Sequence, residues 1–418
     1  MMIVIPSVRD ADIEGKKVLI RVDHNVVKKG KIIDPYRIDA SLDTIRLILD
    51  RGGKPIIMTH VGRPKDKKTG EIEISEKTSV EPIIKYLNTN LNRKFKIAFG
   101  NTVDMTDKSV LEELEKGRID GVYLPNTRWF AGEEAKGDAA VRFAQDLAAI
   151  ADVFVNDAFG SWQPHASTLH ITRFLPSCAG LLMLREIENL EKVLNPQRPF
   201  VAVVAGSKFD TKIGPLTALL KAADHLVLGG VIYNAYLCAK YQIKIAGIEE
   251  EDIRAAESFV ALAAEYPHKL IELSEVVESD LLDEKTAGKY RSHNIHKLPA
   301  GSELNYVLDI DPNSFSDEKV KTIFRQAKTF FTNAVMGFTP NFSAGSQALY
   351  QMISENESAI KLFGGGDTLQ EFKTLLPQIY QKGLAEDKYY YFTGGGTILK
   401  AIMESTPFGL EPVKALLL

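Results

Sequence analysis

The segment Lys17-Val-Leu-Ile-Arg-Val-Asp-His-Asn25 constrains the fold more than any other part of the chain. Three consecutive apolar residues followed by Val22 are typical of a strand that is covered on both faces, as in a parallel sheet. Arg21, Asp23 and Asn25 follow at a spacing of two, so they point to one side of the extended chain. A structural Arg21–Asp23 ion pair would explain these charges without a function. In open α/β sheets, however, ligands collect at the carboxyl ends of strands.

The length and composition are those of a two-domain globular protein. The chain has 418 residues, which is more than one ordinary core holds, and it is 45% hydrophobic and 25% charged. The net charge of −4 gives no reason to expect nucleic acid or an anionic membrane as a partner. No apolar run reaches the length of a membrane span, and the charged N-terminal segment does not fit a signal peptide.

The two cysteines, Cys178 and Cys238, lack the spacing of metal ligands. We expect them to be buried thiols in a reducing compartment, and therefore predict a cytoplasmic protein.

Alternating strands and helices are predicted over the first 160 residues. We expect strands at 18–22, 55–59, 96–100, 120–124 and 153–155, with helices at 38–49, 80–91 and around 143–150. This alternation predicts a parallel sheet with helical crossovers.

Basic side chains gather at the predicted strand ends of this half. Arg37 lies in the first turn of a helix, where a cation opposes the helix dipole at a cost of a few tenths of a kcal/mol. A solvated arginine or a structural histidine would explain any one of these residues. Together they indicate a pocket for a small phosphorylated acid. The basic set consists of Arg21, Arg37, His60, Arg63 and Arg128.

The second half repeats the alternation with glycines at the strand ends. A helix at 183–194 ends at Asn195-Pro196, which marks a domain boundary. Strands are expected at 200–204, 225–228, 360–363 and 389–392. Glycines that follow several of them would let a phosphate approach backbone N–H groups at helix starts.

Lys208, Lys212 and Asp367 beside these glycines favour a nucleotide site. No G-x-x-x-x-G-K-[ST] sequence is present, which excludes a P-loop enzyme, and no G-x-G-x-x-G follows the first strand. Two further segments offer fewer candidate functional residues. We expect a peripheral helix at 249–266 and an irregular surface connection at 279–300.

The motifs and their order resemble those of the phosphoglycerate kinase family over nearly the whole chain. Arg21-Val-Asp-His-Asn25 is similar to R-V-D-F-N, and Thr59-His-Val-Gly-Arg63-Pro64 to S-H-L-G-R-P. The other matching segments are Asn126-Thr-Arg128 with Gly132-Glu-Glu134, Asn156-Asp-Ala-Phe-Gly160, Gly364-Gly-Gly-Asp367 and Thr393-Gly-Gly-Gly396.

The resemblance implies an α/β protein with two doubly wound parallel-sheet domains facing a cleft. The expected domains are a phosphoglycerate-binding domain at 1–187, to which 405–418 returns, and a nucleotide-binding domain at 188–404. The resemblance also implies a monomer. Its implied substrates are 3-phosphoglycerate or 1,3-bisphosphoglycerate, and ADP or ATP with Mg²⁺.

Roles of individual residues follow from the same resemblance. Those implied to bind phosphoglycerate are Asp23, Asn25, Arg37, His60, Arg63 and Arg128. Those implied to bind the nucleotide are Lys208, Lys212, Gly229, Gly230, Asn333, Gly366, Asp367 and Thr368, with Asp367 tied to Mg²⁺.

The implied reaction is direct, reversible, in-line phosphoryl transfer between the acyl phosphate of 1,3-bisphosphoglycerate and ADP, a step of glycolysis and gluconeogenesis. Such a transfer needs alignment and positive charge rather than a protein nucleophile. Arg37 and Lys212 are the candidates for that charge, with the N–H groups of Gly395 and Gly396. A hinge closure is expected to bring the substrates together and to exclude water.

The chain departs from the family pattern at both sites. Ser161-Trp-Gln-Pro-His165 stands where the family reads T-A-H-R-A-H, so the arginine of that motif is absent near Gln163. Losing a charge-assisted bond would cost roughly 1.5–3 kcal/mol unless something replaces it.

On the nucleotide side, Asp210 and Thr211 are in swapped order. Thr332-Asn-Ala-Val-Met-Gly337 replaces W-N-G-P-M-G, and the acidic residue that usually follows is missing from Phe338-Thr-Pro-Asn341. Asp309-Ile-Asp-Pro312 replaces D-I-G-P.

These departures leave two alternatives to a phosphoglycerate kinase. One is a related kinase that phosphorylates another small acid, and the other is a non-catalytic protein that binds a nucleotide or a phosphorylated acid. Retention of Arg37, Lys212 and Asp367 argues against the second, since a protein that only binds has no need of charges for phosphoryl transfer.

Overall fold

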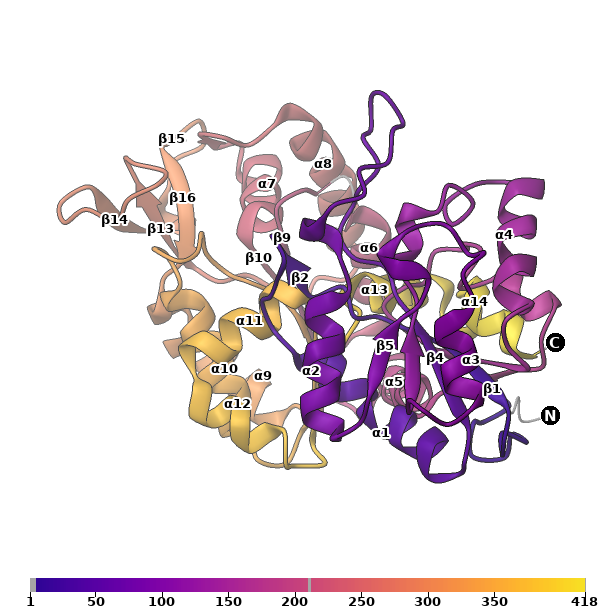
Figure 1. Ribbon diagram of the computed structural model, residues 1–418. Helices are drawn as coiled ribbons and strands as arrows, with labels where there is room; N and C mark the ends of the chain where they lie inside the picture. The colour runs from indigo at the N-terminus through magenta and orange to yellow at the C-terminus, as the bar shows by residue number, and fades with distance from the viewer. Residues whose placement is uncertain (1–4, 210–211, 418) are drawn as a thin grey trace. The chain divides into compact units, whose positions relative to one another are not determined.

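Strand β1 (Lys17–Val22) occupies an interior position of the first sheet in the computed structural model, which describes residues 5–209 and 212–417 (Figure 1). It pairs in parallel with β4 (Lys54–Met58) on one side and with β7 (Val153–Asp157) on the other. The residues Val18–Val22 are all buried, as the apolar run predicts for a strand covered on both faces.

The first sheet has six strands in the order β5-β6-β4-β1-β7-β8, and every pairing is parallel. Val18 and Ile20 belong to a core that also contains residues of α1 and α2, whereas Leu19 packs in a second core with residues of α3 and α4. Helices therefore cover both faces of the sheet. The remaining elements are α1 (Tyr36–Asp50), α2 (Glu81–Leu91), β5 (Phe95–Ile97), α3 (Ser109–Glu115), β6 (Gly121–Tyr123), α4 (Asp138–Ala148) and β8 (Ser177–Ala179).

The chain divides into two compact units. One consists of Met1–Glu188 with Pro407–Leu418, and the other of Asn189–Thr406. Helix α5 (Leu181–Leu194) contains the boundary between them. The short α14 (Glu411–Lys414) belongs to the first unit.

The second unit contains another six-stranded parallel sheet, in the order β12-β10-β9-β17-β18-β19. Its strands are β9 (Phe200–Gly206), β10 (His225–Gly229), β12 (Leu270–Ile271), β17 (Thr329–Asn333), β18 (Ile360–Gly364) and β19 (Tyr389–Phe392). Its helices are α6 (Ile213–Ala222), α7 (Gly230–Tyr241), α8 (Glu250–Ala264), α9 (Glu318–Gln326), α10 (Ala344–Glu355), α11 (Gly366–Leu375), α12 (Pro377–Gly383) and α13 (Gly395–Glu404). The predicted α/β class with two doubly wound parallel sheets is confirmed.

An antiparallel sheet in the second unit was not expected from the sequence. It has the order β14-β13-β16, with β13 (Glu275–Ser279), β14 (Tyr290–Asn294) and β16 (Tyr306–Ile310). The prediction of an irregular connection at 279–300 is therefore wrong for β14. This strand is polar and largely exposed, and an ion pair from Arg291 to Glu278 (2.8 Å) and a hydrogen bond between His293 and Glu278 (2.6 Å) replace an apolar face.

Two minor pairings complete the fold: β2 (Val27–Lys28) with β3 (Lys31–Ile32), and β11 (Lys244–Ile245) with β15 (Glu303–Leu304). Cys178 and Cys238 are both buried free thiols, as predicted. Among the described residues, no helix combines the length and the apolar character that crossing a membrane requires.

A buried carboxyl group lies where β7 ends and α5 begins. The Oδ1 atom of Asp157 accepts a hydrogen bond from the backbone N–H of Met183 (3.0 Å), and Asp157 is fully buried. Burial raises the pKa of Asp157 to about 6, although hydrogen bonds from Thr44 and Met183 oppose the shift. The folded state therefore prefers the protonated form, and this carboxyl increasingly destabilises it as pH rises from about 4 to above 6.

Asp157→Asn should remove this pH dependence, because the amide keeps an acceptor for Met183 but cannot ionise. The difference in free energy of unfolding between the variant and the parent should increase by about 2–3 kcal/mol from pH 4 to pH 8, in favour of the variant. Urea denaturation at a series of pH values measures this difference. The matched control is Asp152→Asn, at an exposed residue beside the same strand. Parallel stability curves for Asp157→Asn and the parent would contradict the expectation.

Candidate functional site

Asp23 and Arg37 form an ion pair at the carboxyl end of β1. Asp23 directly follows the strand and is buried, and its Oδ2 atom lies 3.2 Å from Nη1 of Arg37. The other carboxylate oxygen, Oδ1, is buried and has no hydrogen-bond partner among the described residues. Arg37 is the second residue of α1, and its side chain remains 28% exposed. An unsatisfied acceptor beside a partly exposed cation suits a ligand that carries both a hydroxyl group and an anion.

The segment after β4 supplies His60 and Arg63 and contacts Asn25. The side-chain oxygen of Asn25 accepts a hydrogen bond from the N–H of Gly62 (2.9 Å). Nδ1 of His60 lies 3.1 Å from Nη2 of Arg21. Since a guanidinium group only donates, Nδ1 must accept and Nε2 carries the proton. Burial, reinforced by the charge of Arg21, holds the pKa of His60 well below its ordinary value, so the ring is a neutral donor. Arg63 is exposed.

Arg128 is attached to the same segment from the end of β6. Its Nη1 donates to the carbonyl of Gly62 (2.6 Å), and its Nε lies 2.8 Å from Glu134. The buried side chain of Asn126 accepts from the N–H of Val61 (3.0 Å) and donates to the carbonyl of the same residue (2.8 Å). Hydrogen bonds thus connect the segments that carry Asn25, Arg63 and Arg128.

Arg21 has a structural position. It is 1% exposed, its Nε donates to Oγ of Ser167 (2.8 Å), and Nη2 lies 3.9 Å from Glu133. Ser167 in turn donates to Glu133 (2.6 Å). Burial lowers the pKa of Arg21, and the charge of Glu133 opposes this effect. The Arg21–Asp23 ion pair considered from the sequence is therefore not formed: Arg21 lies near Glu133, and Asp23 pairs with Arg37 instead.

The altered loop at 161–165 brings His165 close to these groups. Its Nε2 lies 4.0 Å from Glu134, and the side chain is 20% exposed. Burial lowers its pKa, although Glu133 and Glu134 oppose the shift. Gln163, by contrast, is exposed, and its carbonyl accepts from the hydroxyl of Thr168 (2.6 Å). His165 and Glu134 are distant in sequence, so only the fold reveals that they lie close together.

In the second unit, the side-chain amide of Asn333 connects three strand ends. Its Nδ2 donates to the carbonyl of Gly364 (2.6 Å), where β18 ends. Its Oδ1 accepts from Nζ of Lys212 (3.2 Å), which also donates to the carbonyl of Ala205 on β9 (2.7 Å). Burial lowers the pKa of Lys212, and the charge of Asp367 opposes the shift. The predicted residues Asn333, Lys212 and Asp367 are thus brought together.

Glycines allow the backbone to approach Asn333 closely. Gly365 has a φ of +108°, and a Cβ atom there would lie 2.5 Å from Nδ2 of Asn333. A Cβ atom on Gly395 would lie 2.6 Å from the Cα of Gly365. Side chains at either position would push these segments apart. We call the group formed by Asn333, Lys212, Gly365 and Gly395 the glycine cradle.

Three helices begin beside the glycine cradle and leave backbone N–H groups for an anion. Gly229 caps α7, and Gly230 is its first residue; a Cβ on Gly230 would lie 3.1 Å from the carbonyl oxygen of Gly206. Gly366 begins α11, and a Cβ there would meet nothing within 4 Å. Gly395 and Gly396 begin α13.

The remaining predicted nucleotide residues lie near these helix starts. Lys208 follows β9 and is exposed, and Asp367 is an exposed residue in the first turn of α11, followed by the buried Thr368. Asp210 and Thr211 lie outside the described residues. No group of three or more histidine, cysteine or acidic residues in the described part of the chain could hold a metal ion by itself. A single carboxylate such as Asp367 nevertheless fits Mg²⁺, which is commonly held by one or two carboxylates together with substrate phosphates.

The altered motif after β17 is held by α10. The hydroxyl of Tyr350 donates to the carbonyl of Ala334 (2.6 Å), and the N–H of Met336 donates to Ser346 (2.8 Å). Asn341 belongs to the segment that lacks the family's usual acidic residue. Its side chain donates to the carbonyl of Asp283 (2.6 Å). The motif is therefore rigidly supported although its sequence departs from the family pattern.

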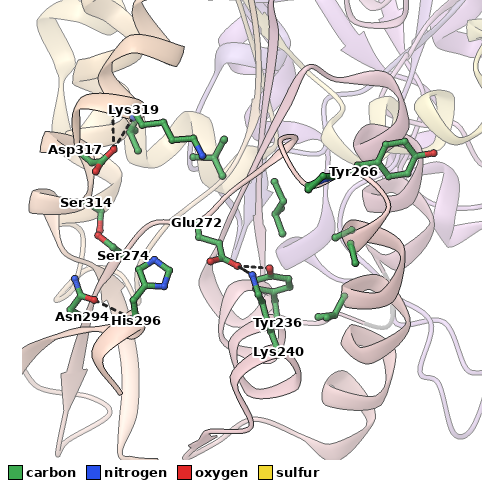
Figure 2. A pocket seen from close by; sticks show the side chains of 17 residues that line it. Tyr236, Lys240, Tyr266, Glu272, Ser274, Asn294, His296, Ser314, Asp317 and Lys319 are labelled. Atoms are coloured by element: carbon green, nitrogen blue, oxygen red, sulfur yellow. Dashed lines mark hydrogen bonds and ion pairs between the residues drawn. The ribbon is translucent and has the colours of Figure 1, made fainter. Parts of the chain in front are cut away.

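A separate cavity of about 750 Å³ lies in the second unit, between α7, α8, β12 and the start of α9 (Figure 2). It contains none of the predicted site residues. Its central carboxylate, Glu272, already accepts from Lys240 and from the hydroxyls of Tyr236 and Tyr241 (2.6 Å for the last). Asp317 caps α9 by accepting from backbone N–H groups. Because these acidic side chains are paired within the protein, they give no indication of a ligand.

Comparison with known proteins agrees with this geometry. Residues 8–405 match the family model for phosphoglycerate kinase. The structure of phosphoglycerate kinase from Coxiella burnetii is 29% identical, with a TM-score of 0.76 and 99% of each chain covered. Phosphoglycerate kinase from Pyrococcus horikoshii OT3 is 22% identical, with a TM-score of 0.74 and 98% of each chain covered, which supports the fold. Since the family match spans nearly the whole chain, the protein belongs to the phosphoglycerate kinase family, and the kinase class predicted from its sequence is confirmed.

Proposed function

We propose that this protein catalyses reversible phosphoryl transfer between 1,3-bisphosphoglycerate and ADP, giving 3-phosphoglycerate and ATP. One observation carries the proposal: each unit has groups suited to binding an anion at the carboxyl ends of its strands. The arrangement of the first unit is basic, with Arg37 beside Asp23. That of the second unit consists of helix starts around Lys212 and Asn333.

The first unit is proposed to bind the phosphoglycerate. The unsatisfied Oδ1 of Asp23 would accept from the substrate hydroxyl, and the neutral His60 would donate from Nε2. The cations would pair with the phosphate and carboxylate groups. The full proposed set is Asp23, Asn25, Arg37, His60, Arg63 and Arg128, and His165 is added to it because of its place beside Glu134.

The second unit is proposed to bind the nucleotide. Its phosphates would meet the N–H groups at the starts of α7, α11 and α13 and the charge of Lys212. Asp367 would hold Mg²⁺, which supplies charge neutralisation on the phosphates. The other residues of this proposed set are Lys208, Gly229, Gly230, Asn333, Gly366 and Thr368.

The protein's own contribution to the transfer is alignment and positive charge. No protein nucleophile is required, since the acyl phosphate or ATP is already activated. Arg37 from the first unit, Lys212 from the second, and the N–H groups of Gly395 and Gly396 would stabilise the charge on the transferred phosphoryl group. We further propose a monomeric enzyme of glycolysis in the cytoplasm, in keeping with the two buried free thiols.

The direct test is ATP- and Mg²⁺-dependent phosphorylation of 3-phosphoglycerate, coupled to reduction of the acyl phosphate by a dehydrogenase. Turnover that depends on all three components supports the proposal. Absence of turnover with Mg·ATP still bound would contradict the assignment of the acid substrate, and absence of both would contradict the assignment as an enzyme.

Arg37→Ala should lower kcat by about 100-fold or more, because it removes charge that the transition state requires. The control is Arg46→Ala on the same helix, whose exposed side chain pairs with Asp43 (3.5 Å) and with no other acidic residue in the described part of the chain. Steady-state kinetics and thermal denaturation of both variants separate catalysis from stability. A kcat equal to that of the Arg46 variant would remove Arg37 from the proposed mechanism.

Asp367→Asn should weaken binding of Mg·ADP by about tenfold or more, because a neutral amide is a poorer ligand for Mg²⁺. The affinity for ADP measured without Mg²⁺ should change little. Isothermal titration calorimetry with and without Mg²⁺ measures both quantities, and Asp387→Asn at an exposed residue of the same unit is the control. Equal loss with and without Mg²⁺ would count against a metal-linked role.

A further inference from the structure

His24 lies between two of the proposed phosphoglycerate residues, Asp23 and Asn25, and is completely buried. Its backbone N–H donates to Oγ1 of Thr59 (3.0 Å). Its ring makes two contacts, from Nδ1 to the hydroxyl of Tyr123 (3.0 Å) and from Nε2 to Oγ of Ser41 (2.8 Å). Where the similar family motif has phenylalanine, this chain therefore has a ring with hydrogen bonds on both nitrogens.

The direction of each hydrogen bond follows from counting protons. The hydroxyl of Ser41 donates to the carbonyl of Ile38 (2.8 Å), so its oxygen must accept from the His24 ring. Nε2 therefore carries the ring proton, and Nδ1 accepts from the hydroxyl of Tyr123. A protonated ring could not accept from Tyr123, so the chain Tyr123–His24–Ser41–Ile38 requires a neutral histidine.

The burial of the ring is consistent with this neutral form. Burial lowers the pKa of His24 to about 3, and the charge of Asp23 opposes the shift only in part. The ring therefore stays neutral at any pH at which the enzyme is assayed. Besides Asp23, the charged group acting on it is Arg21, which disfavours protonation.

The three partners of His24 belong to three different elements that carry site residues. Thr59 directly follows β4 and precedes His60. Tyr123 ends β6 and leads to Arg128. Ser41 lies on α1, one turn after Arg37. His24 itself follows β1 between Asp23 and Asn25, so one residue connects the four segments that carry Asp23 and Asn25, Arg37, His60 and Arg63, and Arg128.

We propose that His24 is a positioning residue for the phosphoglycerate site, whose hydrogen bond to Ser41 sets the first turn of α1 so that Arg37 meets Asp23 and the substrate. The inference rests on the proposed function, because it concerns the same acid site. His24 does not touch the substrate, and its effect passes through Ser41 and Arg37.

Three variants test the role of the Ser41 hydrogen bond. His24→Phe keeps an aromatic ring but removes both side-chain bonds. His24→Gln keeps a donor at the place of Nε2, so it can still reach Ser41. Ser41→Ala removes the link from the other side, and alanine has a higher helix propensity than serine.

His24→Phe and Ser41→Ala should each raise the KM for 3-phosphoglycerate about tenfold, since both variants lose the buried His24–Ser41 hydrogen bond. The KM for Mg·ATP should change by less than about twofold, because none of the residues proposed to bind the nucleotide lies on α1. His24→Gln should restore most of the affinity for 3-phosphoglycerate. A purely structural role would not separate the two substrates in this way.

Calorimetric titration of 3-phosphoglycerate into the parent protein keeps the two hypotheses distinguishable. If the parent does not bind 3-phosphoglycerate, the proposed function and the positioning role that rests on it are both overturned. If the parent binds and Ser41→Ala or a folded His24→Phe binds equally well, the positioning role alone is overturned. Equal increases in KM for both substrates would also overturn it.

Discussion

Buried hydrogen bonds at the carboxyl ends of the parallel strands fix the charged side chains on which the proposed chemistry depends. Long cations at the surface sample many rotamers, and holding one in place costs conformational entropy. In the first unit, the buried side chains of His24 and Asn126 connect β1, β4, β6 and α1. Arg37 is then oriented by Asp23 (3.2 Å) and Arg128 by the carbonyl of Gly62 (2.6 Å). The positive groups are therefore in place before a substrate binds.

The second unit offers an anion mainly backbone N–H groups at helix starts, where the first unit offers mainly charged side chains. Asn333 binds Lys212 on one side and Gly364 on the other, and glycines let the starts of α11 and α13 approach it. Helix N-termini present N–H groups whose positions are fixed by the helix itself, so no side-chain entropy is lost when a phosphate binds. The basic pocket proposed for a small acid and the glycine cradle proposed for a nucleotide, which contains Lys212, are two different arrangements, and the family's reaction uses one of each kind of ligand.

Much of this organisation could be predicted from the sequence because strands buried on both faces leave a clear apolar signal. The strand expected at 18–22 is β1, and the glycines expected at strand ends lie at the starts of α7, α11 and α13. Strand β14 escaped prediction because cross-strand ion pairs, such as Arg291 with Glu278, stabilise it in place of an apolar face. The nearby partner of Arg21, Glu133, is distant in sequence, and no local pattern reveals it. The proton arrangement around His24 likewise depends on three elements that only the fold brings together.

The central claim is that the two units carry separate sites, each built on its own hydrogen-bond network. The most direct test is to measure binding of each substrate to an Asn333→Ala variant. Calorimetry would be performed with Mg·ADP and with 3-phosphoglycerate on the parent and the variant. The account predicts that the variant loses at least about tenfold in affinity for Mg·ADP, because Lys212 and Gly364 lose their common partner, while its affinity for 3-phosphoglycerate is unchanged. Unchanged affinity for Mg·ADP would contradict the central role given to Asn333.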